Sequence, residues 1–96
     1  MFRWDFEKNR ILLETRGISF DEIVEAIIQG FVIAETKHPN HEKYPNQRIM
    51  VIAVKQYTFL VPYVIGGNDF FLKTIIPSRK AYKLYKDAQN GWIQIR

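Results

Sequence analysis

Hydrophobic residues recur with helical spacing in the first third of the chain. The stripe that follows the i, i+3, i+4, i+7, i+8 pattern consists of Phe20, Ile23, Val24, Ile27 and Ile28. Ser19 and Glu22 have the spacing of a capping box just before it, and Gly30 follows it. The pattern therefore predicts an amphipathic helix between Ser19 and Gly30, with its apolar stripe facing a core.

A shorter helical pattern precedes this one. It covers residues 6–16, where Leu12 and Leu13 supply a moderate apolar face. Asp5 is a favourable N-cap, because its carboxylate can accept a hydrogen bond from the first turn. Gly17 is a favourable stop, because glycine readily adopts the left-handed conformation that ends many helices.

Alternating β-branched and aromatic residues replace the helical spacing after Gly30 and predict an antiparallel meander. We expect four strands, over residues 31–35, 48–55, 57–65 and 70–76. The polar stretch 36–47 is the loop between the first two strands, and Gln56 is the turn between the next two. Pro62 indicates a bulge or a locally exposed edge, because proline cannot donate to a ladder. Residues 66–69 read as the next turn.

Pro77 and Ser78 end the last predicted strand and cap a third helix over residues 79–89. The order is then α-α-β-β-β-β-α, an α+β fold in which helices cover one face of a four-stranded antiparallel sheet. The other face is left as a candidate binding surface. We expect the apolar tail 92–96 to pack on the sheet.

Length and composition fit a single folded domain over residues 1–96. Hydrophobic residues make up 47% of the chain and charged residues 25%, the profile of a folded protein rather than a disordered one. The chain has no cysteine, which excludes disulfides and thiolate metal sites. No apolar run is long enough to cross a bilayer, and the N-terminus lacks the apolar stretch of a signal peptide. We therefore expect a cytoplasmic protein without a membrane partner.

Positive charge is concentrated in the second half of the chain. Residues 1–47 hold six Lys and Arg against eight Asp and Glu, a net charge of −2, whereas residues 48–96 hold eight against two, a net charge of +6. This asymmetry favours a polyanionic partner. A basic face that is only solvated is the alternative.

The strand-to-helix junction is the first candidate site. Cations are unfavourable at a helix N-terminus, yet Arg79 and Lys80 follow the Ser78 cap there, and Lys83 lies one turn further on. A bound phosphate would account for this arrangement, because it would meet backbone N–H groups, a hydroxyl, a guanidinium and an ammonium. A solvated cationic helix face explains it equally well.

Three further cations lie on the predicted strands. Arg48 begins one strand and Lys55 ends it. Lys73 shares a strand face with Phe71 and Ile75. A lysine among aromatic residues on an open sheet suits single-stranded RNA, which offers phosphates and stackable bases. The alternative is a lysine whose aliphatic stem lies along the sheet margin.

Histidine and tyrosine supply the candidates for proton transfer. His38 and His41, with Glu42, weakly suggest acid–base catalysis or metal ligation, and an ordinary loop is the commoner case. No third ligand accompanies them, so we expect neither a metal nor another cofactor. Helical spacing puts Tyr82 either beside a cleft or against the sheet. The chain contains no Ser-His-Asp arrangement, phosphate-binding glycine loop or dinucleotide fingerprint.

Several short motifs, in this order and spacing, resemble one known family. Trp4-Asp5 with Lys8 and Asn9, and then Arg-Gly-Ile-Ser-Phe at residues 16–20, resemble the start of BrnT-family toxins. Phe-Leu-Lys-Thr-Ile-Ile-Pro-Ser-Arg-Lys-Ala at residues 71–81, followed by Tyr85, resembles their strand–Arg–helix segment. The segments 38–40 and 43–47 are similar to a subgroup of small toxin-like proteins with the same ends. The resemblance spans about residues 4–85.

The resemblance implies a RelE-like fold and a ribonuclease toxin of a bacterial type II toxin–antitoxin pair, which cleaves RNA and stops translation until its antitoxin binds. The antitoxins of BrnT systems resemble ribbon-helix-helix DNA-binding proteins, so a hetero-oligomer with such a partner is expected. The implied reaction is metal-independent attack of a ribose 2′-OH on the adjacent phosphate, which gives a 2′,3′-cyclic phosphate.

The resemblance also assigns roles to residues by position. Arg79 matches the family's arginine at the strand-to-helix junction and would bind the scissile phosphate. Lys73 would stabilise the charge that develops in the transition state, and Tyr82 or His41 would move a proton. Arg48 and Lys55 are weaker candidates for phosphate contact. The argument from the helix start adds Ser78, Lys80 and Lys83 as candidates for RNA binding.

The family pattern has an arginine, a serine and a glutamate where this chain has Thr74, Pro77 and Ala81. Two other functions therefore stay open: a relative that binds RNA without cleaving it, and a protein-interaction module whose basic face meets an acidic partner. Only the ribonuclease predicts that Arg79→Ala or Lys73→Ala abolishes growth inhibition while the fold stays intact. Only the interaction module predicts no RNA affinity even at low salt.

Overall fold

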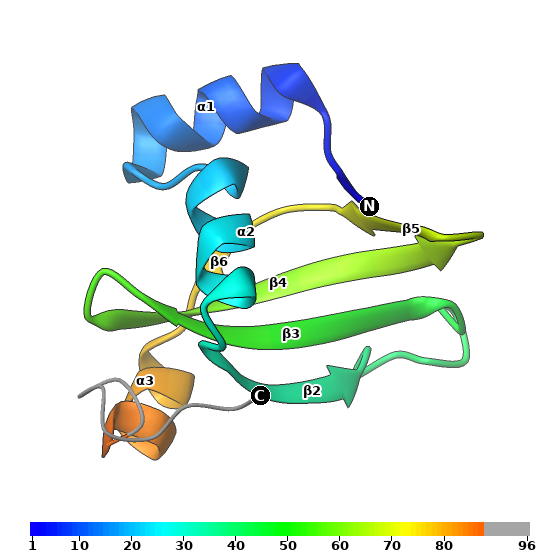
Figure 1. Cartoon of the computed structure of the whole chain (residues 1–96). Helices are drawn as coiled ribbons and strands as arrows, with labels where there is room; N and C mark the ends of the chain where they lie inside the picture. The colour runs from blue at the N-terminus through cyan, green and yellow to red at the C-terminus, as the bar shows by residue number, and fades with distance from the viewer. Residues whose placement is uncertain (88–96) are drawn as a thin grey trace.

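The computed structural model describes residues 1–87 and has the α+β class that the sequence predicts. Its elements are β1 (Phe2–Arg3), α1 (Phe6–Arg16), α2 (Phe20–Ile28), β2 (Val32–Lys37), β3 (Gln47–Val54), β4 (Tyr57–Gly66), β5 (Asp69–Leu72), β6 (Ile76–Pro77) and α3 (Arg79–Asp87) (Figure 1). The tail 92–96 and the last two residues of the predicted helix 79–89 lie outside the described residues.

Both N-terminal helices begin and end where their capping residues predict. Asp5 accepts a hydrogen bond from the Lys8 backbone N–H at 2.8 Å, and Gly17 ends α1 with a left-handed φ of 67°. The capping box of α2 is complete. Its Glu22 N–H donates to Ser19 Oγ at 3.2 Å, and the Ser19 N–H donates to Glu22 Oε1 at 3.1 Å. These bonds satisfy donors that a helix start otherwise leaves unpaired.

The sheet corrects the expectation of four antiparallel strands. Six strands take part, in the order β1-β5-β4-β3-β2, with β6 also pairing β4. The sheet is mixed, because β1 runs parallel to β5 while the other pairs are antiparallel. Phe70 N–H donates to the Met1 carbonyl at 2.8 Å. Two residues carry no periodicity of their own, so β1 exists only through this tertiary pairing. The RelE-like arrangement stays a prediction.

The single strand expected over residues 70–76 is also wrong, because the chain leaves the ladder after Leu72. Lys73 N–H donates to the Pro62 carbonyl at 2.8 Å, and Ile75 then turns inward and is fully buried. The Ile75 carbonyl accepts a bond from Arg16 Nη1 at 2.6 Å. Burial of the Ile75 side chain stabilises the fold by more than the lost ladder bonds cost, because Arg16 and Lys73 supply replacement hydrogen bonds. The alternation predicted that Ile75 shares a face with Lys73, and this is wrong, because Ile75 is buried while Lys73 is exposed.

The turn between β3 and β4 contains two residues, Lys55 and Gln56, instead of Gln56 alone. Both have left-handed backbones, with φ of 54° and 59°. Two such residues make the tight turn whose twist matches that of a hairpin. The strands consequently end at Val54 and resume at Tyr57, which pairs Arg48 with Tyr63.

Pro62 is buried inside β4, and the register with β3 continues through it without a bulge, so the bulge or locally exposed edge that the sequence indicated is wrong. Pro62 lies instead at a gap between the partners of β4 on the other side. On this side β5 pairs with β4 from Tyr63 onward, and β6 pairs only as far as Leu60. The Pro62 carbonyl points to the same side, because it accepts the bond from Lys73. The N–H that proline lacks would have pointed into this gap.

The core lies between the sheet and the first two helices. Figure 1 shows α2 crossing β3 and β4, and α1 lying next to the start of α2. The buried cluster consists of Leu12, Ile18, Phe20, Ile23, Ala26, Met50, Ile52, Phe59, Val61, Tyr63, Leu72 and Ile75. On the opposite face of β3, Val51 and Ala53 are buried as well, so the face expected to be open is not open along its whole length. Phe71 and Lys73 are exposed there. No helix within residues 1–87 is long and apolar enough to span a membrane.

Candidate functional site

A cationic pocket of about 300 Å³ lies at the end of the sheet where β3 begins and β4 ends. The residues that line it are Lys37, His41, Pro45, Asn46, Gln47, Arg48 and Ile65. It joins His41 and Arg48, which the sequence names for proton transfer and for phosphate contact. It adds Lys37, which the sequence analysis did not name. We refer to it as the His41 pocket.

A hydrogen-bonded network supports one wall of the His41 pocket. Arg48 Nε donates to Glu35 Oε1 at 2.8 Å, and the Tyr63 hydroxyl donates to the same oxygen. Arg48 and Tyr63 face each other across β3 and β4, and Glu35 pairs with Met50 from the neighbouring β2. Three adjacent strands therefore contribute to the network from one face of the sheet. Tyr63 is 2% exposed, so the network anchors Arg48 to the core.

The network fixes the ionisation of its members. The hydrogen bonds from Tyr63 and Arg48 lower the pKa of Glu35, although burial acts in the opposite direction. Burial, and then the bond to Glu35, raises the pKa of Tyr63 to about 12. The bond to Glu35 raises the pKa of Arg48. At neutral pH the network therefore holds a carboxylate, a neutral phenol and a guanidinium.

The His41 pocket brings together groups of complementary chemistry. A guanidinium and an ammonium, from Arg48 and Lys37, are donors that suit a phosphate. An imidazole, from His41, is the side-chain group that most often serves as a general acid or base. His41 is exposed, whereas Arg48 is about one-third exposed and held at its Nε. A pocket with these groups can bind a phosphodiester and move a proton beside it.

The residues of the strand-to-helix junction form a separate group. Arg79 and Lys80 are the first residues of α3 and are exposed, as is Lys83. The Ser78 hydroxyl caps the helix, accepting a bond from the Ala81 N–H at 3.1 Å. The predicted cap is therefore present, with cations in its first turn.

Tyr82 packs against the sheet instead of standing in a cleft. Its ring stacks on Tyr57 with the ring centres 4.9 Å apart and the planes inclined by 23°. Tyr57 is the first residue of β4, next to the turn. This contact accounts for the half-buried position of Tyr82.

Lys73 and Lys55 lie apart from both groups. Lys73 lines a shallow pocket of about 380 Å³ with Arg3, Asp69 and Phe71, and its ammonium stands 5.4 Å from the centre of the Phe71 ring. The Lys55 ammonium is already bound by other residues of the fold. Its ammonium donates to Glu22 Oε2 at 2.8 Å and to the Gly17 carbonyl at 2.7 Å.

The His41 pocket and the strand-to-helix junction lie at opposite ends of β4, so the length of this strand gives the distance between them. Ser78 N–H bonds the Thr58 carbonyl, at the start of the strand, and Ile65 lines the His41 pocket near its end. Seven residues of extended strand span about 23 Å. The fold joins His41 to Arg48 and keeps Arg79 and Tyr82 at the other end of β4. Lys73 lies beside the middle of β4, on the opposite face of the sheet from Arg48.

The other loop histidine has a local role. His38 Nδ1 accepts the Asn40 N–H at 3.0 Å, and its ring contacts the Tyr44 ring with centres 4.7 Å apart. Within residues 1–87 no group of three His, Cys, Asp or Glu side chains is arranged to hold a metal ion. His38 thus orders the loop that carries His41.

Glu35, Lys37 and Tyr63 are the site residues that sequence reasoning missed. A signal for Tyr63 existed, because counting outward from a two-residue turn at Lys55 pairs Arg48 with Tyr63. A one-residue turn gives the wrong partner and the wrong face. Glu35 and Lys37 follow only from the pairing of β2 with β3 across a long loop. No local pattern reveals that pairing.

The motifs that resemble BrnT toxins map onto the start of α1, the entry to α2, and the segment from β5 into α3. Comparisons of this chain with protein-family models, with curated proteins and with solved structures found no match in any of the three, so its function is inferred from its own geometry and sequence motifs.

Proposed function

We propose that this protein is a cytoplasmic ribonuclease, the toxin of a toxin–antitoxin pair, and that the His41 pocket is its cleavage site. One observation carries the proposal: His41 shares one pocket with two cations, Lys37 and Arg48. Metal-independent RNA cleavage needs a group that moves protons and cations that offset charge on the phosphorane, and these three residues supply both.

The reaction is a transesterification within the RNA. The His41 imidazole takes the proton of a ribose 2′-OH, and the 2′-oxygen attacks the adjacent phosphorus. The bond from phosphorus to the 5′-oxygen then breaks, and the leaving oxygen takes a proton from the Lys37 ammonium. The His41 imidazolium releases its proton to water and the Lys37 amine takes one up from water, which restores both groups. The products are a 2′,3′-cyclic phosphate and a 5′-hydroxyl. Arg48, held at its Nε by Glu35, offers its other nitrogens to the phosphate.

The cations outside the His41 pocket extend the RNA path. Arg79, Lys80 and Lys83 are exposed on α3, and Lys73 is exposed beside Phe71. Lys73 and Phe71 lie on the face of the sheet opposite the core, whereas Arg48 lies on the core face with its partner Tyr63. Single-stranded RNA that passed around the edge of the sheet would meet phosphate contacts on both faces and an aromatic ring on one. In this proposal Arg79 and Lys73 contribute chiefly to affinity, and loss of either weakens cleavage less than loss of His41.

The test is cleavage of a labelled single-stranded RNA in EDTA, with the termini identified by mass spectrometry. We expect fragments ending in a 2′,3′-cyclic phosphate, and a fall of about 100-fold or more for His41→Ala. The matched control is Arg10→Ala, which removes one exposed cation from α1 and should cleave like wild type. Wild-type cleavage by His41→Ala, at equal soluble yield, would rule out this site.

A second function, RNA binding without cleavage, is favoured by the distribution of the cations. The cations lie at both ends of β4 and between them. Such a spread suits contact with a long backbone more than a compact catalytic centre. The same assay separates the two functions. RNA that stays intact while anisotropy reports salt-dependent binding supports the second function, and absence of binding at low salt argues against both.

The toxin proposal includes an antitoxin, which would cover the His41 pocket with an acidic segment. Co-expression with the product of the neighbouring gene, followed by purification, should give a complex in which cleavage is suppressed. Inducible expression of the chain alone should arrest growth, and His41→Ala should relieve the arrest. Normal growth at high soluble expression would contradict the toxin role.

A further inference from the structure

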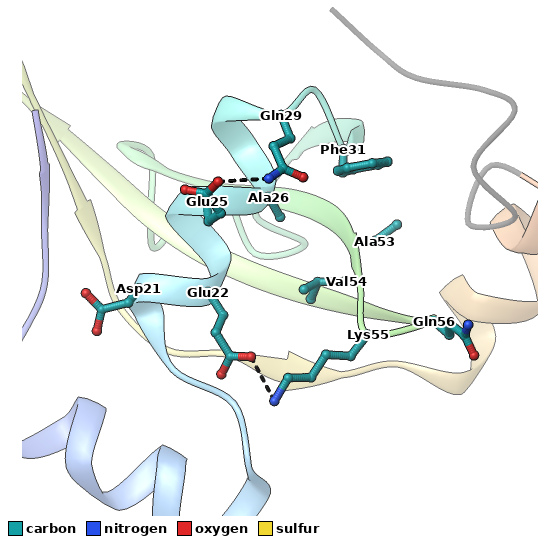
Figure 2. A pocket seen from close by; sticks show the side chains of 10 residues that line it. All are labelled: Asp21, Glu22, Glu25, Ala26, Gln29, Phe31, Ala53, Val54, Lys55 and Gln56. Carbon is teal, nitrogen blue, oxygen red and sulfur yellow. Dashed lines mark hydrogen bonds and ion pairs between the residues drawn. The ribbon is translucent and has the colours of Figure 1, made fainter.

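A second pocket, of about 490 Å³, lies between α2 and the turn that joins β3 to β4. The residues that line it are Asp21, Glu22, Glu25, Ala26, Gln29, Phe31, Ala53, Val54, Lys55 and Gln56 (Figure 2). It shares no residue with the His41 pocket. Its volume lies in the range of ligand-binding clefts. We refer to it as the α2 pocket.

The helix side of the α2 pocket is acidic. Asp21, Glu22 and Glu25 lie along α2, and Figure 2 shows Glu22 reaching Lys55 while Glu25 meets Gln29. The Lys55 ion pair offsets one of the three negative charges. Asp21 has only the Asn9 amide, at 3.4 Å, and within residues 1–87 no cation pairs with Asp21 or Glu25. The pocket thus carries net negative charge on a chain whose net charge is +4.

The floor of the α2 pocket is apolar. Ala26 and Ala53 are 5% and 6% exposed, and Val54 and Phe31 are partly buried against the core. Carboxylates at the margin of an apolar floor suit a ligand with an apolar part and a cationic part. The apolar part would lose contact with water on the floor while the cation stays near the carboxylates.

The position of the pocket favours a polypeptide over a small molecule. Phe31 joins it directly to β2, and Phe31 O accepts the Ala53 N–H at 3.1 Å. β2 is the last strand in the sheet order, so within the described part of the chain no strand lies along its outer edge. An edge strand beside a pocket is the arrangement in which an added strand supplies backbone bonds and the pocket selects a side chain.

We propose that the α2 pocket and the adjoining edge of β2 form a docking site for an extended segment of a partner protein, in which an apolar residue and a lysine or arginine stand two positions apart and so share one face of the segment. The apolar side chain rests on Ala26 and Val54, and the cation meets Glu25 and Asp21. The part of β2 that adjoins the α2 pocket is its start, residues 32–34, and neither these residues nor those of the α2 pocket line the His41 pocket. The docking site therefore does not depend on the proposed ribonuclease activity.

The probe for the test is a short capped peptide in which leucine and lysine stand two positions apart with threonine between them, titrated into the ¹⁵N-labelled full chain. We expect shifts at the backbone amides of residues 31–34 and 53–56. Glu25→Lys should weaken the affinity by about tenfold or more. The matched control is Glu14→Lys, which makes the same change of charge on exposed α1 and should leave the affinity unchanged. Glu25→Gln, which nearly preserves size, should give a smaller loss and guards against misfolding of the lysine variant.

Three results would overturn the docking site. The first is equal binding of the matching leucine–glutamate peptide. The second is equal loss of affinity in both lysine variants. The third is spermidine alone shifting the same amides with the same affinity, which would make the pocket a site for small cations. RNA cleavage measured on the same variants should be unchanged, so failure of the docking site and failure of the ribonuclease proposal are distinguished.

Discussion

Arg48 and Tyr63 face each other across β3 and β4, and both donate to the same carboxylate oxygen of Glu35. One donor comes from the His41 pocket and the other from the core, since Tyr63 is 2% exposed. A carboxylate that bridges them ties the orientation of a candidate phosphate ligand to the packing of the domain. The guanidinium is thereby held in place before any phosphate arrives.

The first prediction concerns the ionisation of Tyr63. Its pKa is raised to about 12 from an ordinary value of 10, so the folded state keeps the proton that the unfolded state loses first. The stability that this provides is complete below pH 10 and is lost as the pH rises toward 12. A spectrophotometric titration of the chain's five tyrosines should show a late step that Tyr63→Phe removes. An unchanged late step in the variant would mean that another tyrosine is the buried one.

The second prediction tests the break between β5 and β6 with two neighbouring residues. Ile75 is fully buried, whereas Ile76 is 40% exposed. Ile75→Ala should lower the free energy of unfolding by about 2–5 kcal/mol, because it leaves a cavity in the core. Ile76→Ala should cost about 1 kcal/mol or less. Urea unfolding of both variants provides the measurement. Similar costs would indicate a continuous strand with both side chains half-buried.

The third prediction concerns the turn at Lys55 and Gln56. Gln56 has a φ of 59°, a conformation that is strained for a residue with a Cβ atom. Gln56→Gly should therefore raise the free energy of unfolding by roughly 0.5–1 kcal/mol, after the extra entropy of glycine in the unfolded chain is subtracted. Gln56→Ala, which keeps the strain, is the control. A glycine variant less stable than the alanine variant would contradict the left-handed turn.

The fourth prediction compares Arg48 with Lys55, two cations to which the sequence analysis gave the same role. Arg48 lines the His41 pocket, whereas the Lys55 ammonium is bound to Glu22 and Gly17. Arg48→Ala should reduce by about one the slope of log affinity for RNA against log salt concentration. Lys55→Ala should leave the slope unchanged. Fluorescence anisotropy at several salt concentrations measures both, and an equal change in the two variants would place the RNA path elsewhere.

The sequence by itself determined the features whose bonds close within a few residues. The caps of α1 and α2 and the Ser78 cap of α3 connect positions three residues apart, so residue identity is enough to predict them. The α+β class follows from the same local periodicities. His41 and Arg48 were also recognised as candidates, because their chemistry is visible without a fold.

Only the tertiary structure decided which of those candidates meet. Strand β1 pairs with β5 across more than sixty residues of chain, and Ile75 leaves the ladder because a core formed by distant elements accepts its side chain. The turn at Lys55 and Gln56 set the register that joins Arg48 to Tyr63, and the pairing of β2 added Glu35. Such contacts depend on which distant segments of the chain the whole fold brings together, and a local sequence pattern does not indicate that. For the same reason Arg79 and His41, both named as candidates from the sequence, lie at opposite ends of β4.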